Sequence, residues 1–192
     1  MKIKRYSRQG LFSLFLSCAF LVHLWTLILT FKDFSALIDR TSLWGAFGTL
    51  SYGLLFAFIE SIFVFLVIVL LGFLVSSKWD EAHRVAVLSM LVMIATLWEI
   101  YGQASSIWGF QLRGQILEFI LHFQHPIRFL FLLVGIMCAG IISTILVPAF
   151  LVLRSKGFFD FIQTTIKRIE ILTEFYLVMD VLALIIVVVR NI

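Results

Sequence analysis

Five long apolar runs constrain the fold of this chain more than any other feature of its sequence. They cover residues 10–31, 46–75, 85–107, 129–153 and 171–189. Each has about 20 residues or more, which is the length an α-helix needs to cross the hydrocarbon core of a bilayer. Unpaired backbone groups are costly in lipid, so runs of this length are predicted to be helical. The sequence therefore predicts an all-α, polytopic integral membrane protein with about five transmembrane helices.

Composition leads to the same class of protein. Hydrophobic residues make up 62% of the chain and charged residues 14%, with a mean hydropathy of +1.10. These values lie far from the usual balance of a soluble domain. Five spans with short connections use up the 192 residues, so a single transmembrane domain covering 1–192 is expected.

Basic residues are distributed unequally between the predicted connections. An N-in, C-out arrangement places ten of the fifteen Lys and Arg residues on the cytoplasmic side, as the positive-inside rule requires. A rival topology with a sixth span over 109–127 divides them eight to seven and buries Arg113, Glu118 and His122. We therefore expect a bacterial-type plasma membrane protein with a cytoplasmic N-terminus. Contact with anionic lipid accounts for the net charge of +4, and nucleic acid is not an expected partner.

Four ionisable residues lie at similar depth within the predicted spans: His23, Glu60, Glu99 and Asp180. A charged side chain at mid-membrane costs roughly 2.5–3.5 kcal/mol, so such residues usually face the interior of a bundle. We expect these four to form a buried polar centre. They would serve as neutral hydrogen bonds between helices or, alternatively, as a proton or cation pathway; a transition metal at His23 is a further alternative.

Small residues at helical spacing predict where helices approach closely. One series occurs in the run 46–75 and just before it, and another lies in the run 129–153. We expect these two helices to pack together through Gly45, Thr49, Gly53, Ala57 and Ser61 on one side and Gly135, Ala139 and Ser143 on the other.

Two amphipathic segments, 110–127 and 157–170, are predicted to be interfacial helices, the second being alternatively a docking surface for a partner subunit. In the first, Glu118, His122 and His125 fall at i, i+4 and i+7. That spacing can place three ligands around one metal ion, with water as the fourth ligand. The alternative is an ordinary solvated polar face.

Signatures of enzymes and nucleotide-binding proteins were sought in the sequence. It contains no phosphate-binding glycine loop, no Gly-x-Ser-x-Gly elbow and no zincin motif. A non-catalytic structural or accessory subunit of a membrane complex is the leading interpretation, bound to lipid and to other subunits or further copies. The alternatives are a proton, cation or small-solute transporter and a membrane-embedded enzyme or the anchor of an extracytoplasmic one. No cofactor is predicted apart from the alternative metal.

Overall fold

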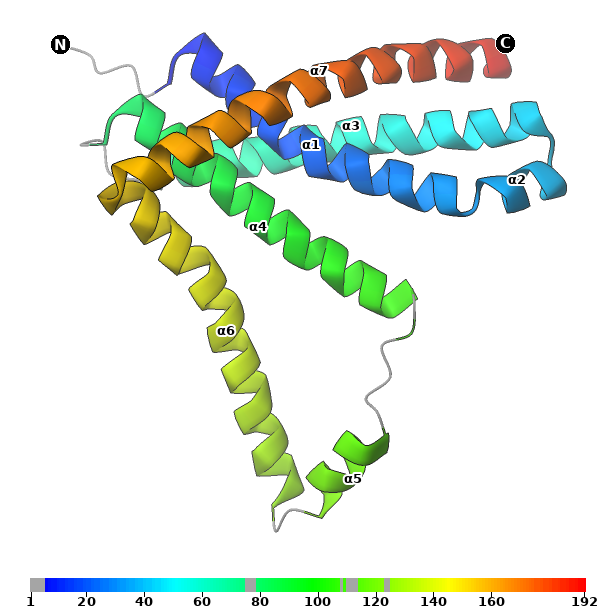
Figure 1. Cartoon of the computed structure of the whole chain (residues 1–192). Coiled ribbons are helices and arrows are strands. Elements are labelled where there is room, and N and C mark those ends of the chain that lie inside the picture. The colour runs from blue at the N-terminus through cyan, green and yellow to red at the C-terminus, as the bar shows by residue number, and fades with distance from the viewer. Residues whose placement is uncertain (1–5, 75–78, 108, 110–113, 123–124) are drawn as a thin grey trace.

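The computed structural model describes residues 6–74, 79–107, 109, 114–122 and 125–192 of the chain. These residues form helices and the segments that connect them (Figure 1). The helices are α1 (Arg8–Lys32), α2 (Phe34–Arg40), α3 (Leu43–Leu74), α4 (Glu81–Ile107), α5 (Gly114–Leu121), α6 (Pro126–Arg154) and α7 (Lys156–Asn191). The short α2, which follows α1 directly, was not predicted from the sequence.

Five of these helices, α1, α3, α4, α6 and α7, are long and apolar enough to cross a membrane. The predicted number and order of such helices are confirmed, and their ends lie close to the predicted ones except at α7, which begins at Lys156 instead of near residue 171. Helices α1, α4 and α7 run in one direction, while α3 and α6 run back (Figure 1). This alternation is the one that successive crossings of a membrane require.

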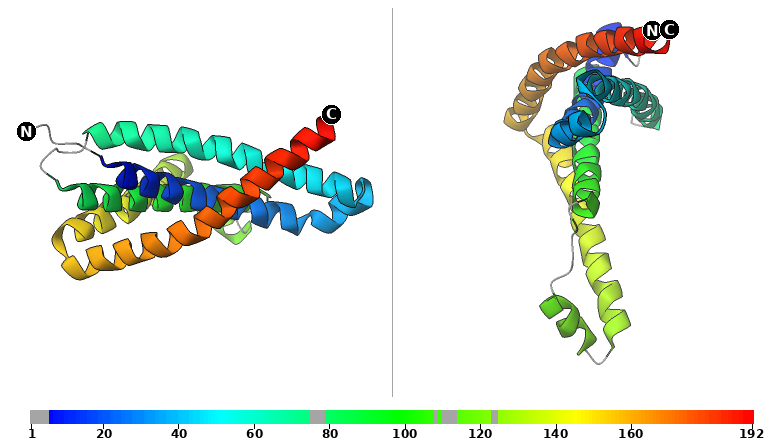
Figure 2. Two further views of the ribbon diagram at one scale, coloured as in Figure 1. Left: turned by 90° about the horizontal axis from the view of Figure 1, so that it is seen from above. Right: turned by 90° about the vertical axis from the view of Figure 1, so that its right-hand side faces the viewer.

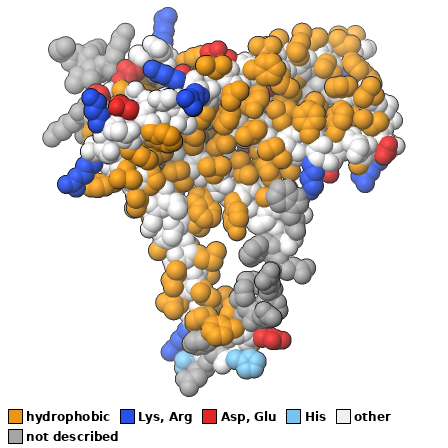
Figure 3. Space-filling model, viewed as in Figure 1, with side chains coloured by type: hydrophobic (Ala, Val, Ile, Leu, Met, Phe, Trp, Pro, Cys, Tyr) orange, Lys and Arg blue, Asp and Glu red, His pale blue; other side chains and the backbone are white. Residues whose placement is uncertain are grey.

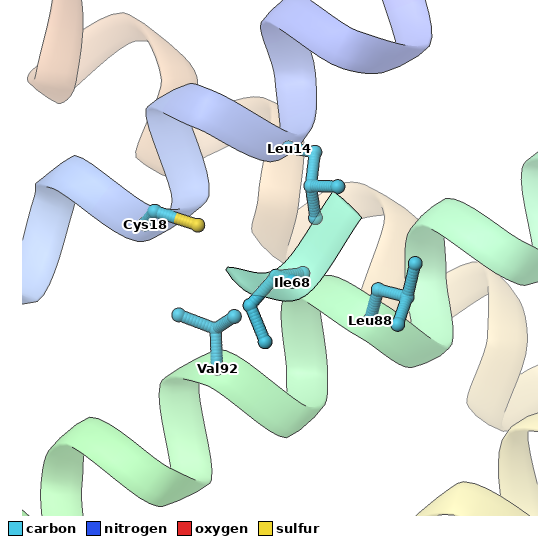
Figure 4. Packing of buried hydrophobic residues seen from close by; sticks show 5 residues of the cluster. All are labelled: Leu14, Cys18, Ile68, Leu88 and Val92. Atoms are coloured by element: carbon cyan, nitrogen blue, oxygen red, sulfur yellow. The ribbon is translucent and has the colours of Figure 1, made fainter. Parts of the chain in front are cut away.

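Helix α1 lies at the centre of the bundle. It packs against α3, α4 and α7, and nine of its residues are buried (Figure 2). On one side, Leu14 and Cys18 of α1 meet Ile68 of α3 and Leu88 and Val92 of α4 (Figure 4). The central position of α1 is consistent with the complete burial of two polar side chains on this helix, Ser17 and His23.

Helix α7 continues without interruption from Lys156 to Asn191. The separate interfacial helix predicted over 157–170 is therefore wrong as a distinct element, because this segment is the first part of the same helix. The physical reason lies in the sequence, which has neither Gly nor Pro between 158 and 191 to end a helix. The amphipathic part and the apolar part share one axis.

Helix α6 diverges from the bundle and carries α5 at its far end (Figure 1). It contacts α4 and α7, but of its described residues only Val152 is buried. Gly135, Ala139 and Ser143 are all exposed. The predicted packing of this small-residue face against α3 is wrong, since the described parts of α3 and α6 make no contact.

The small residues of α3 instead face α1 and α7. Gly45, Ala57 and Ser61 are buried and Gly53 is half-buried, whereas Thr49 is exposed. A Cβ added at Gly53 would lie 3.3 Å from Cγ2 of Thr26 on α1. Small-residue spacing thus identified a face of close approach, but it contains no information about which helix approaches.

Candidate functional site

His23 is a fully buried polar side chain at the middle of α1, with an exposed fraction of 0%. Its Nδ1 lies 2.8 Å from the backbone carbonyl oxygen of Ala19, one turn earlier in the helix. The ring is thereby held with its second nitrogen, Nε2, pointing away from the axis of α1.

The carboxyl group of Asp180 on α7 contacts that second nitrogen. The distances from Nε2 of His23 to the two carboxylate oxygens of Asp180 are 2.9 and 3.1 Å. Asp180 is itself buried, with an exposed fraction of 6%. Two of the four predicted polar residues, 157 positions apart in the sequence, therefore form a closed pair between α1 and α7.

The geometry of the pair fixes the number of protons it holds. A carbonyl oxygen only accepts hydrogen bonds, so Nδ1 of His23 carries a proton that it donates to Ala19. The contact between Nε2 and the carboxyl group then needs one more proton, carried by either partner. Imidazolium with carboxylate, or imidazole with carboxylic acid, both have a net charge of zero. That neutrality makes the pair compatible with burial in a medium of low polarity.

Aromatic rings support the pair from one side. Tyr176 of α7 stacks on the His23 ring, with centroids 6.0 Å apart and an interplanar angle of 9°. The same tyrosine also stacks on Phe20 of α1, at 6.1 Å and 19°. Tyr176 lies one turn before Asp180, so a single face of α7 supplies both the acid and the ring that orients its partner.

Glu60 and Glu99 do not join this pair, and both side chains are exposed. Glu99 accepts a hydrogen bond from Nε2 of Gln103 at 3.2 Å, and Oε1 of Gln103 accepts one from Trp25 at 2.6 Å. Glu60 of α3 lies in the neighbourhood of Glu99 of α4. Of the four residues of the predicted centre, His23 and Asp180 are therefore buried together, whereas Glu60 and Glu99 lie outside the pair. Depth along a helix follows from the sequence, but rotation about its axis depends on which neighbours pack there.

A cavity of about 520 Å³ opens at the end of the bundle where α1 and α4 begin. Its walls come from α1, α4 and α7, and they include the acidic residues Glu81, Glu170 and Glu174. Glu81 accepts the backbone N–H of Ser7 at 2.6 Å, and Glu170 accepts the hydroxyl of Ser13. Sequence reasoning missed this site because it assigned the polar positions of 157–170 to a solvated interfacial face.

The proposed metal ligands do not share one helical face. Helix α5 ends at Leu121, so His122 lies in a turn and His125 precedes α6, while residues 123–124 and 110–113 are outside the described part. Nδ1 of His122 lies 2.7 Å from the backbone oxygen of Glu118. Within the described residues, no three His, Cys, Asp or Glu side chains are grouped suitably for a metal ion. Helix α5 is shorter than the predicted 110–127 segment, and a metal site at Glu118, His122 and His125 stays a prediction.

The chain was compared with protein-family models, with curated proteins and with solved structures, and none of them matches it.

Proposed function

We propose that this protein is a structural or accessory subunit of a membrane complex, and that α6 is the helix through which it associates. The observation that supports this proposal is the exposure of α6, of whose described residues only Val152 is buried. Its small-residue positions are open, and a Cβ added at Gly135 would meet no described atom within 4 Å. Small residues in membrane helices allow the backbones of two helices to approach closely. A second helix from another subunit or another copy fits this face.

The proposed setting is a bacterial-type plasma membrane with the N-terminus in the cytoplasm. Figure 3 supports a bilayer as the surrounding medium, because hydrophobic side chains cover the visible side of the bundle and charged ones gather at its extremities. Arg8, Arg84, Arg154 and Lys156 all lie where α1, α4 and α7 begin or α6 ends. Anionic lipid on the cytoplasmic face would be attracted to this end.

The test is the composition of the particle that is extracted gently from the native membrane, read by native mass spectrometry. We expect reproducible partner chains or a defined homo-oligomer. Gly135→Leu should reduce the associated fraction roughly tenfold, equivalent to about 1.4 kcal/mol, by filling the close-approach face. Met137→Leu, two positions along α6, is the matched control and should leave association unchanged. A wild-type chain that is monomeric and free of partners would contradict the proposal.

A second candidate function is proton handling within the membrane, as part of transport or of energy coupling. The specific observation in its favour is the buried pair of His23 and Asp180, which is neutral only while it holds one shared proton. Acid and imidazole groups buried in membrane proteins commonly form proton relays. The two candidates are compatible, since a subunit of a complex can also carry a proton site.

A further inference from the structure

We infer that the cavity between α1, α4 and α7 admits protons to the His23–Asp180 pair from the end of the bundle where α1 begins. This inference rests on the proton-handling role just proposed for the pair. It assigns an access route and a direction, neither of which follows from the pair alone. The residues on this route are Ser13 and Ser17 of α1 and Glu170, Glu174 and Tyr176 of α7.

Helices α1 and α7 pack in one constant register. Ser13 bonds to Glu170, and His23 bonds to Asp180, and in both contacts the partners are 157 positions apart. The two helices therefore run side by side in the same direction for the ten residues between the contacts, about 15 Å of helix. One polar contact lies in the wall of the cavity and the other is the buried pair. A single helix–helix seam joins the two sites.

The seam between α1 and α7 is polar on the side of the cavity. Glu174, one turn beyond Glu170, also lines the cavity and lies six residues, or about 9 Å along the axis, from Asp180. At the same level, Ser17 and Thr173 are fully buried, and their hydroxyls donate to carbonyl oxygens of their own helices. Because each hydroxyl hydrogen is already donated, these buried hydroxyls offer their oxygen lone pairs as acceptors for water or a proton. Between these hydroxyls and His23 lie the stacked rings of Phe20 and Tyr176.

On the side away from the cavity, an apolar cluster packs beyond the pair. One turn beyond Asp180, Ala183 packs with Leu50 and Leu54 of α3 in a buried apolar cluster. Leu27 of α1 and Met179 of α7 pack against the same cluster. Beyond the pair, neither the rest of α1 nor the rest of α7 carries a carboxyl group, so the two sides of the pair differ. The asymmetry gives the route its direction.

The chemistry of the route is the transfer of one proton to the pair. Three carboxyl groups and one ammonium group, Lys167, line the cavity, and their negative excess raises the local proton concentration. A proton arriving from water leaves imidazolium beside carboxylic acid, which changes the charge of the pair from zero to +1. At this depth the ionisable groups on the packed helices are Tyr176 on α7, Glu60 on α3 and Glu99 on α4.

The test is the exchange rate of the His23 ring protons with solvent deuterium, measured by ¹⁵N-histidine NMR on the full chain in lipid nanodiscs. The His23 signal is assigned from its absence in His23→Gln. We expect the double variant Glu170→Gln/Glu174→Gln to slow exchange on the order of tenfold. Glu118→Gln removes an exposed carboxyl far from the route on α5, and it should exchange at the wild-type rate.

The outcomes separate the route from the role of the pair. Unchanged exchange in the double variant would overturn the route while leaving the proton-binding pair intact. If the His23 ring shows no change of protonation between about pH 4 and 9, both the route and the proton-handling role are wrong. A second, independent experiment uses Gln163→Cys in a Cys138→Ser background, because Gln163 lines the cavity. Labelling that thiol with a bulky reagent should slow exchange as well, and an unaffected rate would count against the cavity as the route.

Discussion

The contact between His23 and Asp180 predicts a measurable coupling between α1 and α7. Replacing Asp180 with Leu removes both oxygens that face Nε2 at 2.9 and 3.1 Å, while the imidazole stays in a site with 0% exposure. A buried polar group left without a partner costs about 1–3 kcal/mol. Replacing His23 with Leu leaves Asp180 unpaired and has a cost of the same order. The double variant leaves neither group unpaired.

The double variant should therefore be more stable than the sum of the two single effects implies. Hydrogen bonds between membrane helices average about 0.6 kcal/mol and reach about 1.7 kcal/mol. Because this pair is fully enclosed and contacts both carboxylate oxygens, we expect a coupling energy at the upper end, about 1–2 kcal/mol.

The measurement is a double-mutant cycle on the free energy of unfolding, obtained by steric trapping in bicelles. A parallel cycle between His23→Leu and Ser143→Ala serves as control, since Ser143 is exposed on α6. The control cycle should be additive within about 0.3–0.5 kcal/mol. Additivity of the His23 and Asp180 substitutions within the same margin would refute the claim that this pair joins the two helices.

Two further predictions concern close packing and helix capping. Gly53→Leu should lower the free energy of unfolding by about 1–3 kcal/mol, because a Cβ there lies 3.3 Å from Thr26. Gly102→Leu is the control, since a Cβ at Gly102 has no described atom within 4 Å. Equal thermal stability of the two variants would contradict the close packing of Gly53. Asp80→Ala should cost about 1 kcal/mol at neutral pH, because Asp80 accepts the backbone N–H of His83 at 3.1 Å. Slight burial raises the pKa of Asp80, but hydrogen bonds from the His83 backbone and ring outweigh this and lower it overall. The stabilisation is thus present above the ordinary carboxyl pKa and disappears as pH falls through the lowered value, so a pH-independent difference from wild type would disprove it.

The sequence alone predicted the five long helices, because length and hydropathy are local properties of each run. It also selected His23 and Asp180 correctly as residues that face the interior. It could not separate them from Glu60 and Glu99, whose depth is similar but whose helices leave them exposed. All four have small or polar neighbours one turn away, so the flanking residues do not distinguish a side chain that contacts a neighbouring helix from one that faces outward.

The cavity and the position of α6 were beyond the sequence for a different reason. The acidic residues Glu81, Glu170 and Glu174 come together only because α1, α4 and α7 run in the same direction and begin at the same end. Their shared surface is a property of three helices, whereas amphipathic spacing describes one. Similarly, the small residues of α6 predicted a face of close approach, but no described helix of the chain lies against Gly135.

The 157 positions between His23 and Asp180 have a consequence for biosynthesis. At roughly 5–20 residues per second, a ribosome needs on the order of 8–30 s to make the chain between them. During much of that interval His23 lacks its acid, and α1 lacks the α7 side of its packing. Until α7 is made, the central helix of the bundle is therefore in an incomplete environment, and the imidazole needs another hydrogen-bond partner. Arrival of α7 closes the bundle and ends that exposure.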